Sequence, residues 1–157
     1  LLHLSLAALY WETYAPTVAA TTLRTFLTVC KLKKLKINQV DVTTAFLYGD
    51  IDGEIFMRPS PAYSTPGQVW RLKKSIYGLK QSPKCWSHKQ NAVLAKQGFR
   101  PTKSDRCLFV RGDASTNQAY VLAYVDDCLI AAQSDQELTS IKEGLMKHSG
   151  GFTRPVH

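Results

Sequence analysis

The chain has 157 residues, which is enough for one domain or for part of a larger one. Its hydrophobic content of 45% is ordinary for a folded core, and no segment is repeated or of low complexity. The 20 basic residues exceed the 12 acidic ones and give a net charge of +8. This surplus indicates a polyanionic partner such as nucleic acid, and the alternative is a solvated basic surface without a partner.

The cysteines do not form a zinc site by their spacing. Cys30, Cys85, Cys107 and Cys128 are scattered, with no C-x-x-C pair and no histidine at ligand spacing, so we expect reduced intracellular thiols. Residues 1–10 are apolar but too few to span a bilayer, and they lack the basic start of a signal peptide. We expect a buried helix or a displaced junction sequence there, and no membrane partner.

The first half of the chain predicts a helix followed by short strands. Residues 16–36 have apolar side chains at helical spacing and end in four lysines, which suit a helix C-terminus or form a phosphate-binding face. Residues 37–42 alternate as a strand, and 43–48 form a short apolar helix or turn. Two further strands are predicted at 54–57 and 69–72, on either side of a loop rich in proline.

The second half of the chain predicts a similar mixture. A helix is expected over 82–98, a strand over 107–110, a hairpin over 119–132, and a final helix after Ser134 as its N-cap. Helices mixed with antiparallel hairpins indicate an α+β domain rather than a doubly wound parallel sheet.

Two adjacent carboxylates, Asp126 and Asp127, interrupt the apolar run 119–132. Burying them without a partner is costly. One interpretation is a hairpin of strands 119–125 and 128–132 with Asp-Asp as its turn. The favoured two-residue turns need positive φ, however, and prefer Asn-Gly or Asp-Gly. The other interpretation is that the tip of the hairpin presents carboxylates to a divalent metal.

Asp41 lies inside the predicted strand 37–42, in a similar local pattern. Because strand side chains alternate between faces, Asp126 and Asp127 diverge, and one of them can meet Asp41 across neighbouring strands. Two carboxylates about 4 Å apart repel by about 4 kcal/mol at an effective dielectric near 20, so the cluster needs a positive charge. Lysine could supply it, but oxygen ligands around an open space suit Mg²⁺ that also holds phosphates. A pair of such ions activates a hydroxyl and stabilises a leaving pyrophosphate.

Four motifs occur in order along the chain, at residues 14–18, 39–50, 71–83 and 124–127. Together they resemble the entry segment, the first catalytic motif, the template- and nucleotide-positioning motif and the metal-binding motif of one family. That family is the reverse transcriptase domain of copia-type LTR retrotransposon Pol polyproteins. The similarity covers about residues 12–147 as a partial palm and fingers domain, between divergent segments at 1–11 and 148–157.

The resemblance implies an RNA-directed DNA polymerase that transfers a nucleotide from a deoxynucleotide triphosphate to a primer 3′-hydroxyl. Asp41 and Asp126 would hold two Mg²⁺ ions, with Mn²⁺ as a possible substitute. Asp127 would assist, and the backbone carbonyl of Val42 would contact one ion. Carried over in the same way, Phe46 would pack under the incoming sugar and exclude a 2′-hydroxyl, whereas without the resemblance it is equally an ordinary core aromatic.

The nucleotide- and template-binding residues implied by the resemblance lie in the third motif. Tyr77 and Gly78 would approach the nucleotide and template strand, where glycine permits close backbone approach, and the alternative is a plain turn. Contacts to the phosphate backbone would come from Gln81, Lys73, Lys74 and Lys80. The implied partners are an RNA or DNA template-primer, deoxynucleotide triphosphates, and the integrase and RNase H of the polyprotein. The implied location is intracellular, in a cytoplasmic particle or the nucleus.

Both ends of the chain depart from the family pattern. Residues 1–10 contain no lysine or arginine where the family has a basic fingers segment, and residues 149–157 bear no likeness to it. We therefore expect truncation or a shifted reading frame at both ends. Two alternatives to a working polymerase remain: an inactive retroelement remnant that keeps nucleic-acid binding, and another two-metal enzyme such as a nuclease or phosphatase. The chain supplies none of the remaining ligands that the second alternative needs.

Overall fold

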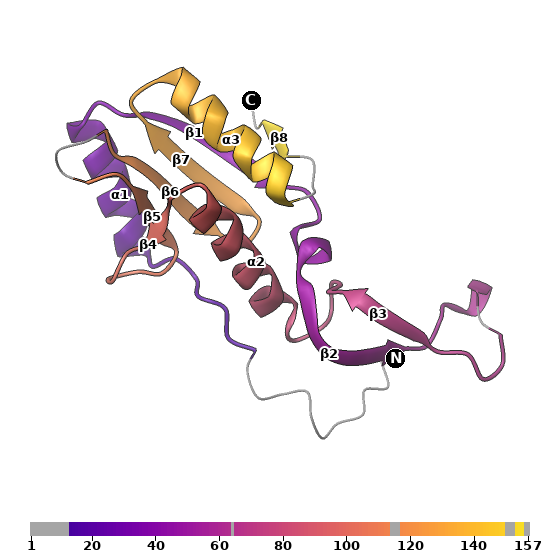
Figure 1. The fold of residues 1–157 in the computed structure, drawn as a ribbon. Coiled ribbons are helices and arrows are strands. Elements are labelled where there is room, and N and C mark those ends of the chain that lie inside the picture. The colour runs from indigo at the N-terminus through magenta and orange to yellow at the C-terminus, as the bar shows by residue number, and fades with distance from the viewer. Residues whose placement is uncertain (1–12, 64, 114–116, 150–152, 156–157) are drawn as a thin grey trace.

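The structure, a computed structural model, describes residues 13–63, 65–113, 117–149 and 153–155 (Figure 1). Its elements in chain order are α1 (Ala20–Leu32), β1 (Lys36–Val42), the 3₁₀ helix η1 (Ala45–Tyr48), β2 (Asp50–Met57), the 3₁₀ helix η2 (Pro61–Tyr63), β3 (Trp70–Lys74), α2 (Ser82–Lys96), β4 (Arg100–Pro101), β5 (Leu108–Arg111), β6 (Ala119–Tyr124), β7 (Asp127–Ala132), α3 (Asp135–Ser149) and β8 (Thr153–Pro155).

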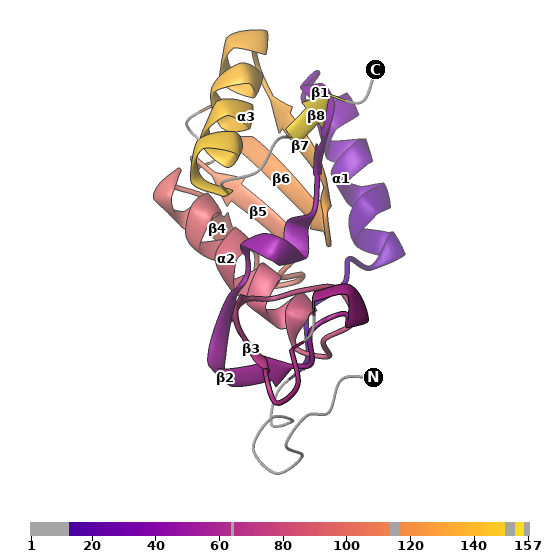
Figure 2. The same ribbon diagram turned by 90° about the vertical axis from the view of Figure 1, so that its right-hand side faces the viewer.

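Six of the strands form one sheet in the order β4-β5-β6-β7-β1-β8, and every neighbouring pair in it is antiparallel. Strands β2 and β3 form a separate antiparallel pair. Helix α1 covers one face of the large sheet, and α2 and α3 cover the other (Figure 2). The α+β prediction is therefore confirmed: the fold mixes helices with antiparallel sheets.

The apolar run in β6 reflects burial on both faces of the sheet. Val121 and Ala123 face α2 and α3 in the largest hydrophobic cluster, while Leu122 packs with Phe26 and Cys30 of α1. A strand that is covered on both sides needs no polar alternation, so its sequence is almost continuously apolar. The two charged residues that follow this run therefore lie where the covered part of the sheet ends.

Helix α1 is shorter than the sequence predicts, because a distant carboxylate fixes its first turn. Asp105 accepts hydrogen bonds from the backbone N–H of Ala19 (3.2 Å) and from the hydroxyl of Thr22 (2.6 Å). Three of the four lysines at 31–36 lie beyond the last helical residue, Leu32. Lys33 donates hydrogen bonds to Gln118 and Tyr120, and Lys36 forms an ion pair with Asp135. These two lysines therefore contact other side chains of the same chain.

The remaining predicted elements agree with the structure to within a few residues. Ser134 caps α3 as expected, since its hydroxyl oxygen accepts the backbone N–H of Glu137 (3.2 Å). Strands β4 and β8 have only 2 and 3 residues, too few for a sequence pattern to reveal. The expected helix or junction sequence at residues 1–10 lies outside the described residues.

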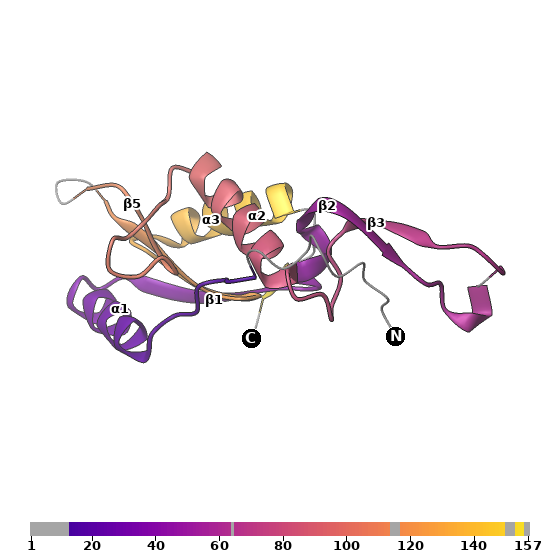
Figure 3. The same ribbon diagram turned by 90° about the horizontal axis from the view of Figure 1, so that it is seen from below.

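The β2–β3 pair projects from the end of the large sheet (Figures 1 and 3). Ile55 is its buried residue, whereas Phe56, Tyr63 and Trp70 are 42%, 73% and 43% exposed. Two surface ion pairs link its charged side chains, one between Arg71 and Glu54 and the other between Lys74 and Asp50.

Candidate active site

The hairpin of β6 and β7 turns one residue earlier than an Asp-Asp turn would. Tyr124 pairs with Asp127, so the two central residues of the turn are Val125 and Asp126. The expected turn at Asp126–Asp127 is therefore wrong, and Asp127 is the first residue of β7. The physical reason is the backbone of Val125, which has a φ of 54°. A tight hairpin turn needs a positive φ at its first central position, and here Val125 adopts it.

Positive φ is unusual for a β-branched residue and marks a strained backbone. Two hydrogen bonds hold this turn. The indole N–H of Trp86 in α2 donates to the carbonyl of Val125, and the backbone N–H of Val42 at the end of β1 donates to the carbonyl of Asp126 (2.9 Å). The turn is thus tied both to a helix beneath the sheet and to the strand that bears Asp41.

Asp41 meets a carboxylate across the neighbouring strand, as the alternation argument predicts. The register of β1 and β7 places Asp41 directly opposite Asp127. Side chains of directly opposed residues lie on one face, here the face that α1 covers farther along. The carboxylate of Asp127 accepts a hydrogen bond from the side-chain amide of Gln39 (3.0 Å). Asp126 stands beside this pair in the turn, and all three aspartates are half-buried.

Tyr77 lies close to two of the three carboxylates. Burial, and then the negative charges of Asp126 and Asp41, raise the pKa of its phenol. The Tyr77 ring also contacts Phe46, with ring centroids 4.8 Å apart and an angle of 54° between the rings. Residues from the second, third and fourth motifs of the sequence, apart by up to 85 positions, are therefore brought to one place.

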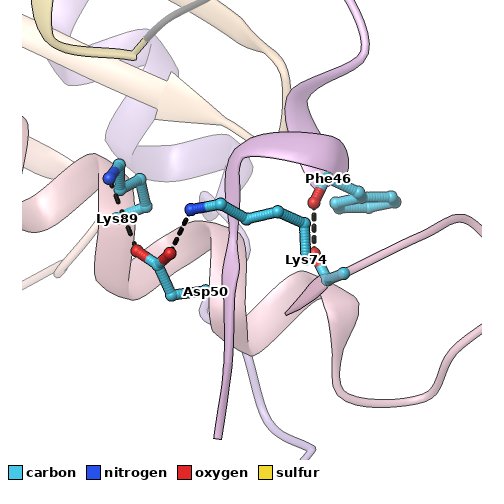
Figure 4. A network of polar contacts seen from close by, with 5 residues as sticks. Phe46, Asp50, Lys74 and Lys89 are labelled. Carbon is cyan, nitrogen blue, oxygen red and sulfur yellow. Dashed lines mark hydrogen bonds and ion pairs between the residues drawn. The ribbon is translucent and has the colours of Figure 1, made fainter. Parts of the chain in front are cut away.

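A second set of contacts fixes the segment that carries Phe46. The hydroxyl of Ser75 donates to the carbonyl of Phe46, and the backbone N–H of Ser75 donates to the carbonyl of Gly49 (2.9 Å). A Cβ at Gly49 would lie 2.7 Å from the Ser75 hydroxyl and 2.9 Å from the Cβ of Cys85, so only glycine fits this approach. Figure 4 shows the neighbouring ion pairs, in which Asp50 lies between Lys74 and Lys89.

The other residues predicted to bind the nucleotide or template differ in their exposure and in their contacts. Gly78 has a φ of 92° and open space where a Cβ would lie. Lys73 and Lys80 are exposed, and Lys74 pairs with Asp50. Gln81 is buried at the N-cap of α2, and its contact with phosphate stays a prediction.

Two cavities lie beside the β6–β7 hairpin. One, of about 460 Å³, lies on the α1 face and is lined by Leu23, Leu122 and Leu129 together with Gln39, Tyr124 and Asp127. The other, of about 420 Å³, lies on the α2 face and has Phe46, Trp86 and Val125 in its wall. Asp127 therefore borders the cavity on the α1 face, and Val125 of the turn borders the cavity on the α2 face.

Three supporting residues escaped the sequence analysis, namely Gln39, Trp86 and Gln90. Gln90 donates to the thiol sulfur of Cys128 (3.4 Å), which is fully buried below the aspartates. Burial, and then the charge of Asp127, raise the pKa of Cys128 to about 12, so this thiol stays protonated and chemically inert at neutral pH. Trp86 and Gln90 follow the helical spacing of a core face, so no local signal separates them from ordinary core residues.

The described part of the chain contains no group of three or more acidic, histidine or cysteine side chains gathered closely enough to hold a metal ion by themselves. Mg²⁺ is commonly bound through one or two carboxylates plus substrate phosphates rather than by an all-protein cage. Asp41 and Asp126 offer carboxylates of that kind next to Tyr77. Within the described ranges, no helix is long and apolar enough to cross a membrane.

Comparison with known proteins agrees with this geometry. A model of the family described as reverse transcriptase (RNA-dependent DNA polymerase) matches residues 6–150. The chain belongs to this family.

Curated relatives place the match within transposon polyproteins. The chain is similar to the retrovirus-related Pol polyprotein from transposon TNT 1-94 of Nicotiana tabacum, with 35% identity over 87% of this chain and 10% of the relative. It is 39% identical to the Pol polyprotein from transposon RE2 of Arabidopsis thaliana, over 77% of this chain and 8% of the relative. The Ty1-ER2 Gag-Pol polyprotein of Saccharomyces cerevisiae is 33% identical over 76% of this chain and 7% of its own length. The chain thus spans a tenth or less of these relatives, and the predicted resemblance to a partial reverse transcriptase domain of copia-type Pol polyproteins is confirmed.

Proposed function

We propose that this chain is the catalytic core of an RNA-directed DNA polymerase. It would transfer a nucleotide from a deoxynucleotide triphosphate to a primer 3′-hydroxyl, with RNA or DNA as template. The observation that carries this proposal is the position of Asp41 opposite Asp127 on β1 and β7, beside the turn that bears Asp126 and is hydrogen-bonded to Val42. The large sheet with α2 and α3 would be the palm, and the β2–β3 pair would belong to the fingers.

Divalent metal ions would bind chiefly at two carboxylates, those of Asp41 and Asp126. Reverse transcriptases as a family use such ions, and in two-metal enzymes a pair of them stabilises the attacking and leaving oxygens. Asp41 and Asp126 would bind Mg²⁺, or Mn²⁺, with the Val42 carbonyl as a further ligand. Asp127 would play a secondary part, which agrees with the hydrogen bond that its carboxylate already accepts from Gln39.

The nucleotide would lie against the aromatic pair. Phe46 would pack under its sugar and exclude a 2′-hydroxyl, and Tyr77 and Gly78 would lie against the nucleotide and template. The contact between the two rings supports this role, because it presents one apolar surface beside the carboxylates. The open space around Gly78 would let a nucleic-acid strand approach the backbone.

Nucleic acid would be held mainly through its phosphates. The net charge of +8 favours a polyanion, and Lys73 and Lys80 are exposed on the segment that leads into Tyr77 and α2. Lys74 and Gln81 are less available, because the first is paired with Asp50 and the second is buried. Contacts of this kind are independent of sequence and weaken with added salt.

The relatives suggest the wider setting in which the chain works. Since they are Pol polyproteins, this core would act with an RNase H and an integrase, inside a cytoplasmic particle or the nucleus. The alternative is an inactive remnant with residual nucleic-acid binding, for which the net charge of +8 would be enough.

A primer-extension assay tests the proposal. The protein is incubated with a homopolymer RNA template, a labelled primer, the matching deoxynucleotide triphosphate and Mg²⁺. Incorporation is expected for the wild-type chain and should fall at least about a hundredfold in Asp126→Asn, because the carboxylate that binds the metal is lost while its shape is kept. Asp52→Asn is the matched control, since Asp52 is an exposed carboxylate of β2, away from the turn.

The two readings give different results in this assay. Incorporation by the wild type and by Asp52→Asn, but not by Asp126→Asn, supports a polymerase. If all three proteins show only background incorporation but bind the template-primer in a salt-sensitive way, the chain is an inactive remnant and the proposed polymerase activity is wrong.

A further inference from the structure

We propose that Trp86 is a positioning residue for the catalytic turn. Its indole N–H, donated to the carbonyl of Val125, holds Asp126 in place relative to Asp41. The hydrogen bond is a feature of the fold itself, whereas its consequence for catalysis rests on the proposed function of Asp126.

The turn needs such support because its backbone is strained. Val125 is β-branched and has a φ of 54°, a conformation that such a residue keeps only where its surroundings enforce it. A change of φ at Val125 would rotate the peptide group that follows and move Asp126, the next residue. The position of the Asp126 carboxylate therefore depends on whatever holds Val125.

Packing against the turn on the α2 face is incomplete. Val125 and Trp86 both line the cavity of about 420 Å³ there, so open space borders the turn on this side. The hydrogen bond from the indole adds a directional contact between α2 and the turn.

Trp86 is itself held firmly and touches the strand that bears Asp41. Its side chain is 3% exposed and packs in one cluster with Val42 and Ala45. Val42 follows Asp41 directly, and its N–H donates to the carbonyl of Asp126. One indole thereby contacts both sides of the site, the turn through a hydrogen bond and the end of β1 through packing.

Trp86→Phe tests this role, because it keeps a buried aromatic ring and removes the N–H donor together with part of the indole. Trp70→Phe is the matched control, since Trp70 lies exposed on β3. The first measurement is the hydrogen-exchange rate of the Val42 amide relative to that of Ile130 in the central strand β7. The second is Mn²⁺ affinity, measured by water proton relaxation. In Trp86→Phe we expect about tenfold faster relative exchange at Val42 and about tenfold weaker Mn²⁺ binding, and neither change in Trp70→Phe.

Each outcome decides the matter. Unchanged relative exchange at Val42 in Trp86→Phe would overturn the proposal, whatever the metal affinity. Faster exchange with wild-type Mn²⁺ affinity would overturn it as well, because the position of the turn would then not govern the site. Faster exchange in a protein whose wild type binds no Mn²⁺ would support the role of Trp86 in holding the turn and would count against the proposed polymerase function instead.

Discussion

The large sheet and the β2–β3 pair differ in how they hold their charged residues. In the sheet, Asp41 and Asp127 are opposed on neighbouring strands above a buried core, and the turn at Asp126 is tied to Trp86 and Val42. In the β2–β3 pair, Asp50 and Glu54 are exposed and meet lysine or arginine at the surface. Carboxylates that face one another across neighbouring strands can serve as ligands for a metal ion, whereas carboxylates neutralised by surface cations are less suited to that role.

The largest expected effect concerns the core below the site. Ile130→Ala should lower the free energy of unfolding by about 2–5 kcal/mol, because Ile130 is fully buried in the main cluster. Ile55→Ala in β2 should cost clearly less, since Ile55 lies outside the three hydrophobic clusters of the described residues and its surroundings can relax. Urea denaturation measures both values, and equal costs would contradict the distinction between the two regions.

An effect of intermediate size is the pH dependence of the free energy of unfolding, which reports how far the Cys128 thiol is shielded from water. The Cys128 thiol has a pKa of about 12 in the folded chain, above its ordinary value of 9.0. Below pH 9 both folded and unfolded states keep this proton, so its contribution to stability is fully present. Between pH 9 and 12 only the unfolded thiol ionises, so stability falls as the pH rises, by at most about 1.4 kcal/mol per pH unit.

Cys128→Ala removes this dependence. The stability advantage of the wild type over the variant should therefore shrink from pH 8 to pH 10.5, as measured by denaturant unfolding at each pH. A difference that stays constant over this range would mean that the Cys128 site is wetter than its burial indicates. The β2–β3 pair contains no cysteine, so this probe is specific to the large sheet.

The smallest expected effect concerns the surface ion pairs. Lys74→Ala should change the free energy of unfolding by less than about 1 kcal/mol, because Lys74 and Asp50 are both largely exposed. The change should decrease further in 1 M salt, where exposed charges are screened. A loss above about 2 kcal/mol would show that the base of the β2–β3 pair is more rigid than its exposure indicates.

Sequence patterns predicted the parts of the site that depend on local alternation. Asp41 lies within a strand, and one of the two later aspartates opposes it, as side-chain alternation requires. The position of the turn was wrong by one residue, since nothing local indicates that Val125 would adopt a positive φ. The contact of Trp86 with Val125 joins residues 39 positions apart and depends on how α2 packs against the sheet. Similarly, Asp105 fixes the start of α1 from 86 residues away.

The most direct test of the central claim is to locate bound Mn²⁺ by paramagnetic broadening of backbone amide signals. At substoichiometric Mn²⁺, broadening is expected first at Val42, Asp126 and Asp127, where the sheet brings the carboxylates together. Asp50 and Glu54 of the β2–β3 pair should be affected only at much higher Mn²⁺ concentrations. Broadening centred on β2, or equal broadening of all exposed carboxylates, would contradict the claim that the large sheet carries the metal-binding site.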